Sequence, residues 1–188
     1  MKNKFDRLCE LATMVASDDP YLAAQAAKAP LLDERAMLSL ASSETRAAVL
    51  KALAERPGLS TKALRALLSA EPPAEVATLA LRGYKGHKAL REAARHPNRF
   101  VRRIAAAHPN TEEGVLNDLA LDNYEEVRMA LTTREEIPLS VQRLLARDPS
   151  AEVRKGIARY LDRRDFQLEV YEILKEDIDP SVSDIVIK

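Results

Sequence analysis

An internal repeat is the feature that most constrains how this chain can fold. Three segments resemble one another and end in Val-Arg: Asn98–Arg102, Tyr124–Arg128 and Ser150–Arg154. The anchor valines Val101, Val127 and Val153 are spaced 26 and 26 residues apart. Looser copies place Thr45-Arg46 and Val76 in the same role, with Leu22 and Val182 as weaker terminal copies. The spacing predicts about six units of roughly 26 residues each.

Each copy has the pattern of two short helices. Apolar residues three and four positions after the anchor, such as Ala130 and Leu131 after Val127, lie on one helical face. A proline turn such as His108-Pro109-Asn110 ends this helix. A second apolar set follows, such as Leu116 and Leu119. One unit alone is too small to bury both apolar faces, so neighbouring units are expected to stack.

The composition agrees with a helical protein. The 188 residues include 30 Ala and 26 Leu, with 4% aromatic residues and no Trp, which suits closely packed helices better than strands. We expect one all-α domain over residues 1–188, with a capping helix at 1–17, repeats at 18–175 and a cap or tail at 176–188. Because Val182–Ile187 is rich in β-branched residues, both a cap and an extended tail stay open. An irregular helical bundle is the alternative to stacked repeats.

Residues 96–160 carry the strongest resemblance to a known family. His-Pro-Asn-Thr is followed by a Leu-x-x-Leu-Ala helix, an acidic joint and Val-Arg. This pattern resembles the leucine-rich repeat variant and, more broadly, the HEAT-like α-solenoids, with a moderate match over 41–95. The resemblance implies a right-handed α-solenoid in which α-helices alternate with short second helices. Some members carry a cysteine-rich iron–sulfur segment, but Cys9 alone cannot hold a cluster, so we expect no cofactor.

Charged residues recur at fixed places in the copies. An arginine directly follows an anchor at Arg46, Arg102, Arg128 and Arg154. Five residues before the anchors stand Glu71, His96, Asp122, Asp148 and Asp177. The pattern favours capping of the joints by aspartate together with ion pairs between units. A basic stripe for a phosphate backbone is the alternative.

The neutral total charge hides a strongly basic region. Residues 46–103 carry thirteen basic and four acidic groups, whereas residues 104–188 carry eleven basic and eighteen acidic groups. Within 82–103 only Glu92 opposes eight cations, which we predict to be the partner-binding residues: Arg82, Lys85, Lys88, Arg91, Arg95, Arg99, Arg102 and Arg103.

This basic face can serve an acidic protein surface or duplex nucleic acid, or be a solvated face neutralised by neighbouring acids. The low aromatic content argues against binding of single strands. Seven acidic residues between Asp165 and Lys188 add a charge separation that also permits head-to-tail association.

Catalytic chemistry is not indicated. The histidines are His87, His96 and His108, and two of them lie in His-Pro-Asn turns, where Pro and Asn form the bend itself. Cys9 is expected to lie on the N-terminal helix and to be buried in the protein core. The sequence contains no glycine-rich phosphate loop. We therefore expect that the protein is not an enzyme and that it binds neither a metal ion nor a small-molecule substrate.

The longest stretch without a charge is eight residues, and the N-terminus lacks a signal-peptide pattern. With a single cysteine, this predicts a cytoplasmic protein without membrane contact. The expected function is a non-catalytic protein–protein interaction module that presents the basic face 82–103 to an acidic partner. The alternative is a duplex nucleic-acid-binding HEAT-like protein that uses the same face.

Overall fold

The computed structural model describes residues 10–11, 13–30, 32–43, 47–56, 59–69, 74–82, 86–162 and 168–187. Every regular element within these ranges is an α-helix, which confirms the all-α prediction for the described part of the chain. The chain forms two compact units, Met1–Glu92 and Ala93–Lys188. Of the capping helix expected at 1–17, residues 10–11 and 13–17 are described; 10–11 and 13–15 are helical, and Ala16 and Ser17 lie beyond the end of the helix.

The first unit contains α2 (Pro20–Lys28), α3 (Glu34–Ser43), α4 (Ala47–Ala54), α5 (Thr61–Ser69), α6 (Ala74–Arg82) and most of α7 (His87–Ala94). Helices α2, α4 and α6 pack in succession, while α3 packs against α5. The core between them is made mainly of alanine and leucine, with Leu53, Leu64 and Leu67 fully buried. The small alanine side chains let neighbouring helices approach closely.

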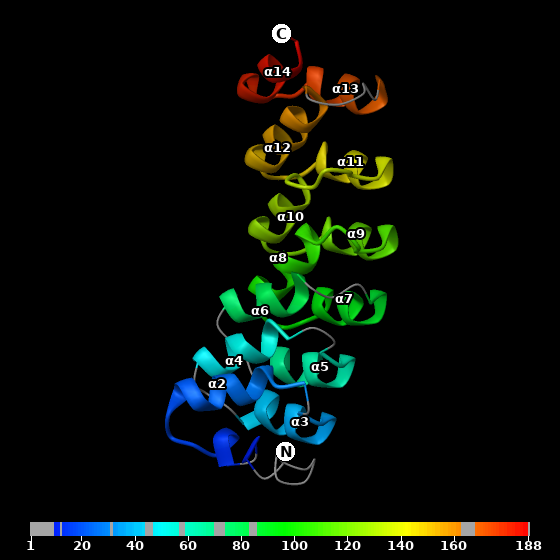
Figure 1. Ribbon diagram of the computed structural model, residues 1–188. Helices are drawn as coiled ribbons and strands as arrows, with labels where there is room; N and C mark the ends of the chain where they lie inside the picture. Colours follow the sequence, from blue (N-terminus) through cyan, green and yellow to red (C-terminus); the bar gives the residue numbers. More distant parts are fainter. Residues whose placement is uncertain are drawn as a thin grey trace. The chain divides into compact units, whose positions relative to one another are not determined.

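The second unit repeats this arrangement with α8 (Arg99–Ala107), α9 (Glu113–Leu119), α10 (Glu125–Leu131), α11 (Leu139–Leu145), α12 (Ala151–Asp162), α13 (Leu168–Lys175) and α14 (Pro180–Val186). Helices α8, α10, α12 and α14 pack one on the next, and α11 packs against α9 (Figure 1). Within this unit each first helix therefore contacts the first helix of the next copy, as expected for repeats that bury one another's apolar faces.

The anchor residues occupy equivalent buried places. Val101 is 2% exposed, and Val127 and Val153 are completely buried. The weaker copies differ from one another: Val76 and Val182 are buried, whereas Leu22 is 39% exposed. The expected role of Leu22 is therefore wrong, because the next residue, Ala23, takes the buried position. Thr45 lies outside the described residues.

The leucines of the second helices are not equally buried. Leu119 is buried in α9, but Leu144 in α11 is only half-buried. Val141 and Leu145 are completely buried and lie one turn apart, so they define the inner face of this seven-residue helix. Leu144 lies at the edge of that face.

The C-terminal segment is a helix and not an extended tail. Asp179 caps α14 by accepting a hydrogen bond from the Ser181 N–H, and Pro180 occupies the first turn. Val182 is completely buried, and α14 packs against α12 and α13. Capping and burial therefore outweigh the weak helical propensity of the β-branched residues.

Candidate interaction surface

Three arginines of the second unit form a ladder of ion pairs with aspartates of the following joints. The Nε of Arg102 lies 2.6 Å from Asp122 Oδ2, and its Nη2 lies 3.1 Å from Asp122 Oδ1. Arg128 binds Asp148 in the same way at 2.6 and 3.0 Å, and Arg154 binds Asp177 at 2.7 and 3.1 Å. Two parallel bonds of this kind fix the orientation of both side chains.

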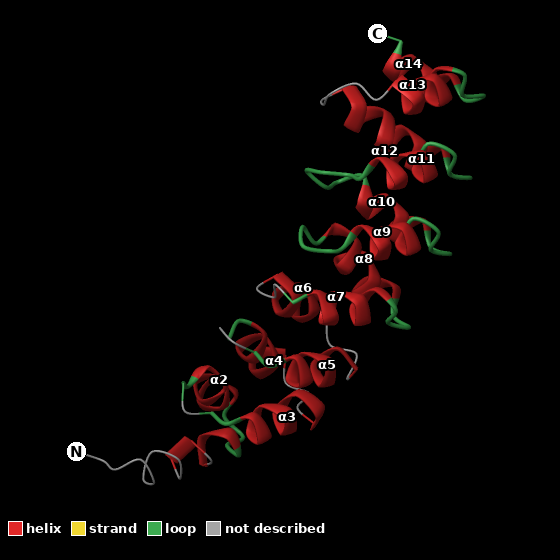
Figure 2. Ribbon diagram, turned by 90° about the vertical axis from the view of Figure 1, so that its right-hand side faces the viewer, coloured by secondary structure: helices red, strands yellow, loops and turns green. Residues whose placement is uncertain are grey.

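Each ladder arginine also holds the joint that precedes it. Arg102 Nη1 donates to the carbonyl oxygens of His96 and Pro97. Arg128 donates in the same way to the Asp122 carbonyl, and Arg154 to the Asp148 carbonyl. Each arginine thus joins two successive joints, and these joints lie in a row along one side of the second unit (Figure 2).

The aspartates have a second task as caps of the joints. Asp122 Oδ1 accepts a hydrogen bond from the Tyr124 N–H, and Asp148 Oδ1 accepts one from the Ser150 N–H. Burial raises the pKa of Asp122, but the hydrogen bonds from Arg102 and from the Tyr124 N–H outweigh it, so the pKa lies below its ordinary value. The pKa of Asp177 is lowered against its burial by Arg154 and the Asp179 N–H. The structural interpretation of the repeated charges is confirmed for these three pairs.

Arg102 is therefore placed differently from the exposed cation that the sequence predicts. Its side chain is 13% exposed and is committed to Asp122 and to two carbonyl groups. It supports the joint and is not accessible as a free guanidinium. Of the other seven predicted residues, the Arg82 side chain and Lys85 lie outside the described parts of the chain.

The remaining predicted cations are divided between the two units. Lys88 and Arg91 are exposed on α7 within the first unit. Arg95, Arg99 and Arg103 belong to the second unit; Arg95 and Arg103 are exposed and Arg99 is partly exposed. None of these three takes part in the ladder.

Arg99 and Arg103 surround two aromatic rings near the start of α8. The Arg99 guanidinium lies 5.3 Å from the centre of the Phe100 ring and 5.1 Å from that of Tyr124. Arg103 lies 5.8 Å from the Phe100 ring. Phe100 and Tyr124 remain 44% and 43% exposed. We call Arg99, Phe100, Arg103 and Tyr124 the α8 cluster; attraction between each guanidinium group and the aromatic rings holds the arginines beside these rings.

One acidic residue reaches this cluster from the next helix. Glu126 on α10 approaches Arg99 to 3.7 Å, and both side chains are about half exposed. An exposed pair of this kind contributes little stability and exchanges readily with solvent or with a competing anion. The α8 cluster therefore keeps a basic character.

Two further arginines escaped the sequence interpretation. Arg134, which follows α10, donates to the carbonyl oxygens of Ala106, His108 and Pro109 at the end of α8. Arg56, which follows α4, binds the carbonyls of Ala27, Ala29 and Pro30 at the end of α2 in the same manner. Each thereby satisfies a carbonyl group of the last helical turn, that of Ala27 or of Ala106, and also binds carbonyl groups of the turn that follows. A signal was available, since each lies two or three residues after a first helix.

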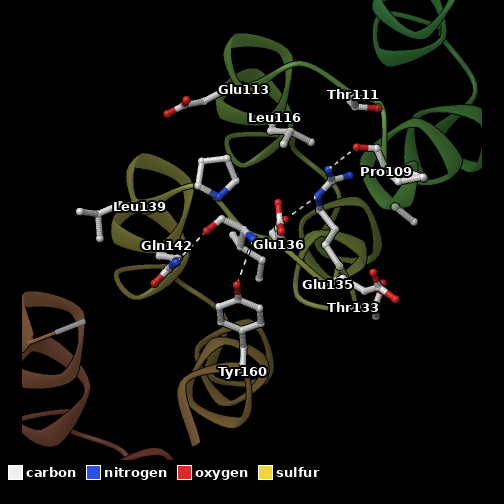
Figure 3. Close-up of a pocket in the computed structure, with 14 residues that line it drawn as sticks. Pro109, Thr111, Glu113, Leu116, Thr133, Glu135, Glu136, Leu139, Gln142 and Tyr160 are labelled. Carbon is white, nitrogen blue, oxygen red and sulfur yellow. Dashed lines mark hydrogen bonds between the residues drawn. The ribbon is translucent and has the colours of Figure 1, made fainter. Parts of the chain in front are cut away.

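A pocket of about 880 Å³ lies beside Arg134 (Figure 3). Its polar side chains serve the loop that precedes α11: the Tyr160 hydroxyl accepts a hydrogen bond from the Ile137 N–H, and Gln142 Nε2 donates to the Ile137 carbonyl. Burial lowers the pKa of Arg134, whose partners are the carbonyl oxygens of the α8 end. The pocket thus contains groups that stabilise the loop.

The histidines of the two His-Pro-Asn turns stabilise those turns. His96 Nδ1 accepts a hydrogen bond from the Asn98 N–H, and His108 Nδ1 accepts one from the Asn110 N–H. His87 is exposed at the start of α7. Cys9 lies outside the described residues. Across the described ranges, no cluster of three His, Cys, Asp or Glu side chains has metal-binding geometry.

Comparisons with known proteins do not assign a family. No family model matches the chain, and no curated protein matches it. The crystal structure of an engineered protein from the Northeast Structural Genomics Consortium is similar over 95% of this chain and 92% of that one, at 18% identity and a TM-score of 0.39. That score is too low to establish a shared fold. Among the described helices, none combines the length and the apolar character needed to cross a bilayer.

Proposed function

We propose that this protein is a non-catalytic, cytoplasmic interaction module whose repeats stack into a right-handed α-solenoid of the leucine-rich repeat variant or HEAT-like kind. The successive packing of first helices within each unit supports the stacking. The recurring valine anchors and ladder pairs support a repeat of one structural unit. Such an array presents a firm surface to a partner.

The partner in this proposal is a protein with an acidic surface. The observation that carries the proposal is the α8 cluster, in which two arginines outside the ladder are stacked on half-exposed aromatic rings. Arginine and aromatic side chains are the residue types that most often dominate binding at interfaces. Stacking orders the guanidinium groups before binding, which reduces the entropy lost when a carboxylate is bound. Arg95 adds an exposed cation in the joint that precedes α8.

The test reverses the three cations of the second unit that lie outside the ladder. The variant Arg95→Glu/Arg99→Glu/Arg103→Glu is compared with Lys51→Glu/Lys62→Glu/Lys175→Glu, which changes the same number of charges at exposed sites elsewhere. Circular dichroism first checks that both variants keep their helix content. Fluorescence anisotropy then measures binding to a labelled polyglutamate peptide and to a mixed-sequence DNA duplex over a series of salt concentrations.

The proposal expects binding of the acidic peptide by the wild type and the control variant, and its loss in the α8 variant. Equal binding by both variants contradicts the assigned surface, and absence of binding at low salt contradicts an acidic partner. Tighter binding of the duplex, with a salt slope of about 0.9 for each phosphate contact, would instead support the nucleic-acid alternative.

A further inference from the structure

A groove of about 490 Å³ lies between the joint that precedes α10 and the joint that precedes α12. Its apolar walls include Leu121, which is 70% exposed, the half-buried Leu144 and the exposed Pro149. Arg143 and Arg147 line it as exposed cations. We call these five residues the Leu121 groove. The groove offers an apolar slot beside positive charge, which suits an apolar side chain flanked by carboxylates.

The charges at the base of this groove are already balanced. Arg128 and Asp148 also line it, but they form a ladder pair at 2.6 Å with side chains that are 10% and 2% exposed. Arg143 is paired with Glu169 at 2.6 Å across the surface, with both side chains about half exposed. Arg147 is exposed and donates a long bond to the Arg143 carbonyl. The groove therefore carries positive charge at its rim only.

The matching feature is found in the same unit at the joint between α13 and α14. Ile178 is 95% exposed, an unusual position for a large β-branched apolar residue. The equivalent residues of the other joints, directly after His96, Asp122 and Asp148, are Pro97, Asn123 and Pro149. Ile178 is preceded by Glu176 and Asp177 and followed by Asp179. Glu176 is exposed, Asp177 is held by Arg154, and Asp179 caps α14.

We propose that two copies of this chain associate by placing Ile178 of each copy in the Leu121 groove of the other, with Glu176 beside Arg147. The joints carrying both features lie on one side of the second unit (Figure 2). Two copies side by side and antiparallel can therefore make both contacts at once, related by a two-fold axis. The result is a closed dimer and not an open filament.

Local charge supports this association, although residues 104–188 as a whole carry eleven basic and eighteen acidic groups. In the proposed arrangement Glu176 of each copy lies beside Arg147 of the other, so each contact joins opposite charges. Opposite charges at the two contact sites then favour one register over others. The contact does not use the α8 cluster, so the proposal is independent of the acidic partner proposed above.

The experiment measures the mass of the full chain by sedimentation equilibrium over a concentration series at low and high salt. The wild type is expected to reach dimer mass and no higher, with weaker association at high salt. Ile178→Ser and Leu121→Ser are each expected to raise the dissociation constant by about tenfold or more, since each removes a central apolar contact. Leu168→Ser, which changes a leucine that is 63% exposed in the same unit, is the control and should dimerise normally.

A charge exchange tests the pairing itself. Arg147→Glu and Glu176→Arg should each weaken the dimer, because each brings like charges together in both contacts. Mixing the two variants should restore the dimer as a heterodimer in which both contacts again join opposite charges. A wild type that stays monomeric at every concentration overturns the proposal. So does a dimer that none of these substitutions weakens, or a mixture of the two charge variants that associates no better than either alone.

Discussion

The two units use the same apolar packing, but the copy anchored at Val76 in the first unit differs from the copies of the second unit in how charge supports it. In the first unit, the anchor Val76 is followed by Ala77, so this copy supplies no arginine for a ladder pair. In the second unit, all three anchors from Val101 to Val153 are followed by an arginine that binds the next joint. Both units nevertheless place first helix against first helix. The difference indicates that the apolar columns stack the helices, while the ladder fixes the joints.

A second device is common to both units. Arg56 in the first and Arg134 in the second each bind carbonyl groups at the end of the preceding first helix. Lateral contacts between second helices also recur, with Arg65 and Glu92 in the first unit and Arg143 and Glu169 in the second. These contacts are exposed and contribute little to stability. The ladder is therefore the feature that distinguishes the copies anchored at Val101, Val127 and Val153 from the copy anchored at Val76.

The largest expected effect tests whether the apolar columns are equivalent. Leu67→Ala in the first unit and Leu119→Ala in the second remove buried side chains and should each cost about 2–5 kcal/mol in the free energy of unfolding. Leu144→Ala, at a half-buried position, should cost clearly less. Chemical denaturation measures all three. A loss below about 1 kcal/mol in the free energy of unfolding at both buried sites would contradict the assignment of these leucines to the core of their units.

A smaller effect tests how closely the first helices of the second unit pack. A Cβ added at Gly156 in α12 would lie 2.7 Å from Thr132 Oγ1 and 3.0 Å from Thr132 Cβ. Gly156→Ala should therefore cost about 1–3 kcal/mol through overpacking. Gly114→Ala in α9 meets nothing within 4 Å and should be neutral or stabilise by up to about 1 kcal/mol. A neutral result at Gly156 would indicate looser packing than described.

The smallest effect is the dependence on pH. The folded pKa values of Asp122 and Asp177 lie below their ordinary value, so as the pH falls the unfolded chain takes up protons first, at about pH 3.9. Their stabilisation is complete well above that pH and is lost as the pH falls through the folded pKa values. Hydrogen exchange at pH 7, 5, 4 and 3 should show this loss in residues 93–187.

Asp122→Asn provides the control for the acid effect. Its stability should decline less between pH 5 and 3 than that of the wild type, since one of the titrating groups is gone. Parallel declines in the two proteins would show that Asp122 does not contribute to the acid sensitivity.

Much of the fold could be predicted because burial in repeats follows the sequence period. Val101, Val127 and Val153 in strict register are all buried, and the aspartates five residues before the next anchors cap the joints as predicted. Terminal copies were harder. Leu22 and Ala23 are both apolar, and the sequence alone does not decide which of them faces the core.

The candidate surface could be predicted only in part. Charge composition identified a basic region, but it could not separate Arg102, which is bound internally, from Arg99 and Arg103, which face the rings of Phe100 and Tyr124. The distinction depends on the position directly after the anchor, which turns a side chain toward the next joint. Arg56 and Arg134 were missed because their partners are carbonyl groups, which every residue has; only their shared position, two or three residues after a first helix, marks them in the sequence.

Two double-mutant cycles test the central claim that the ladder arginines have a structural role. The first uses Arg128→Ala and Asp148→Ala, whose side chains are 10% and 2% exposed; the second uses Arg143→Ala and Glu169→Ala, at 44% and 52%. Removing one member of the buried pair should cost about 3–5 kcal/mol, because the other charge is left buried. The coupling energy of the buried pair should be several times that of the exposed pair, which should not exceed about 1 kcal/mol. A buried pair that couples no more strongly than the exposed one would contradict the account.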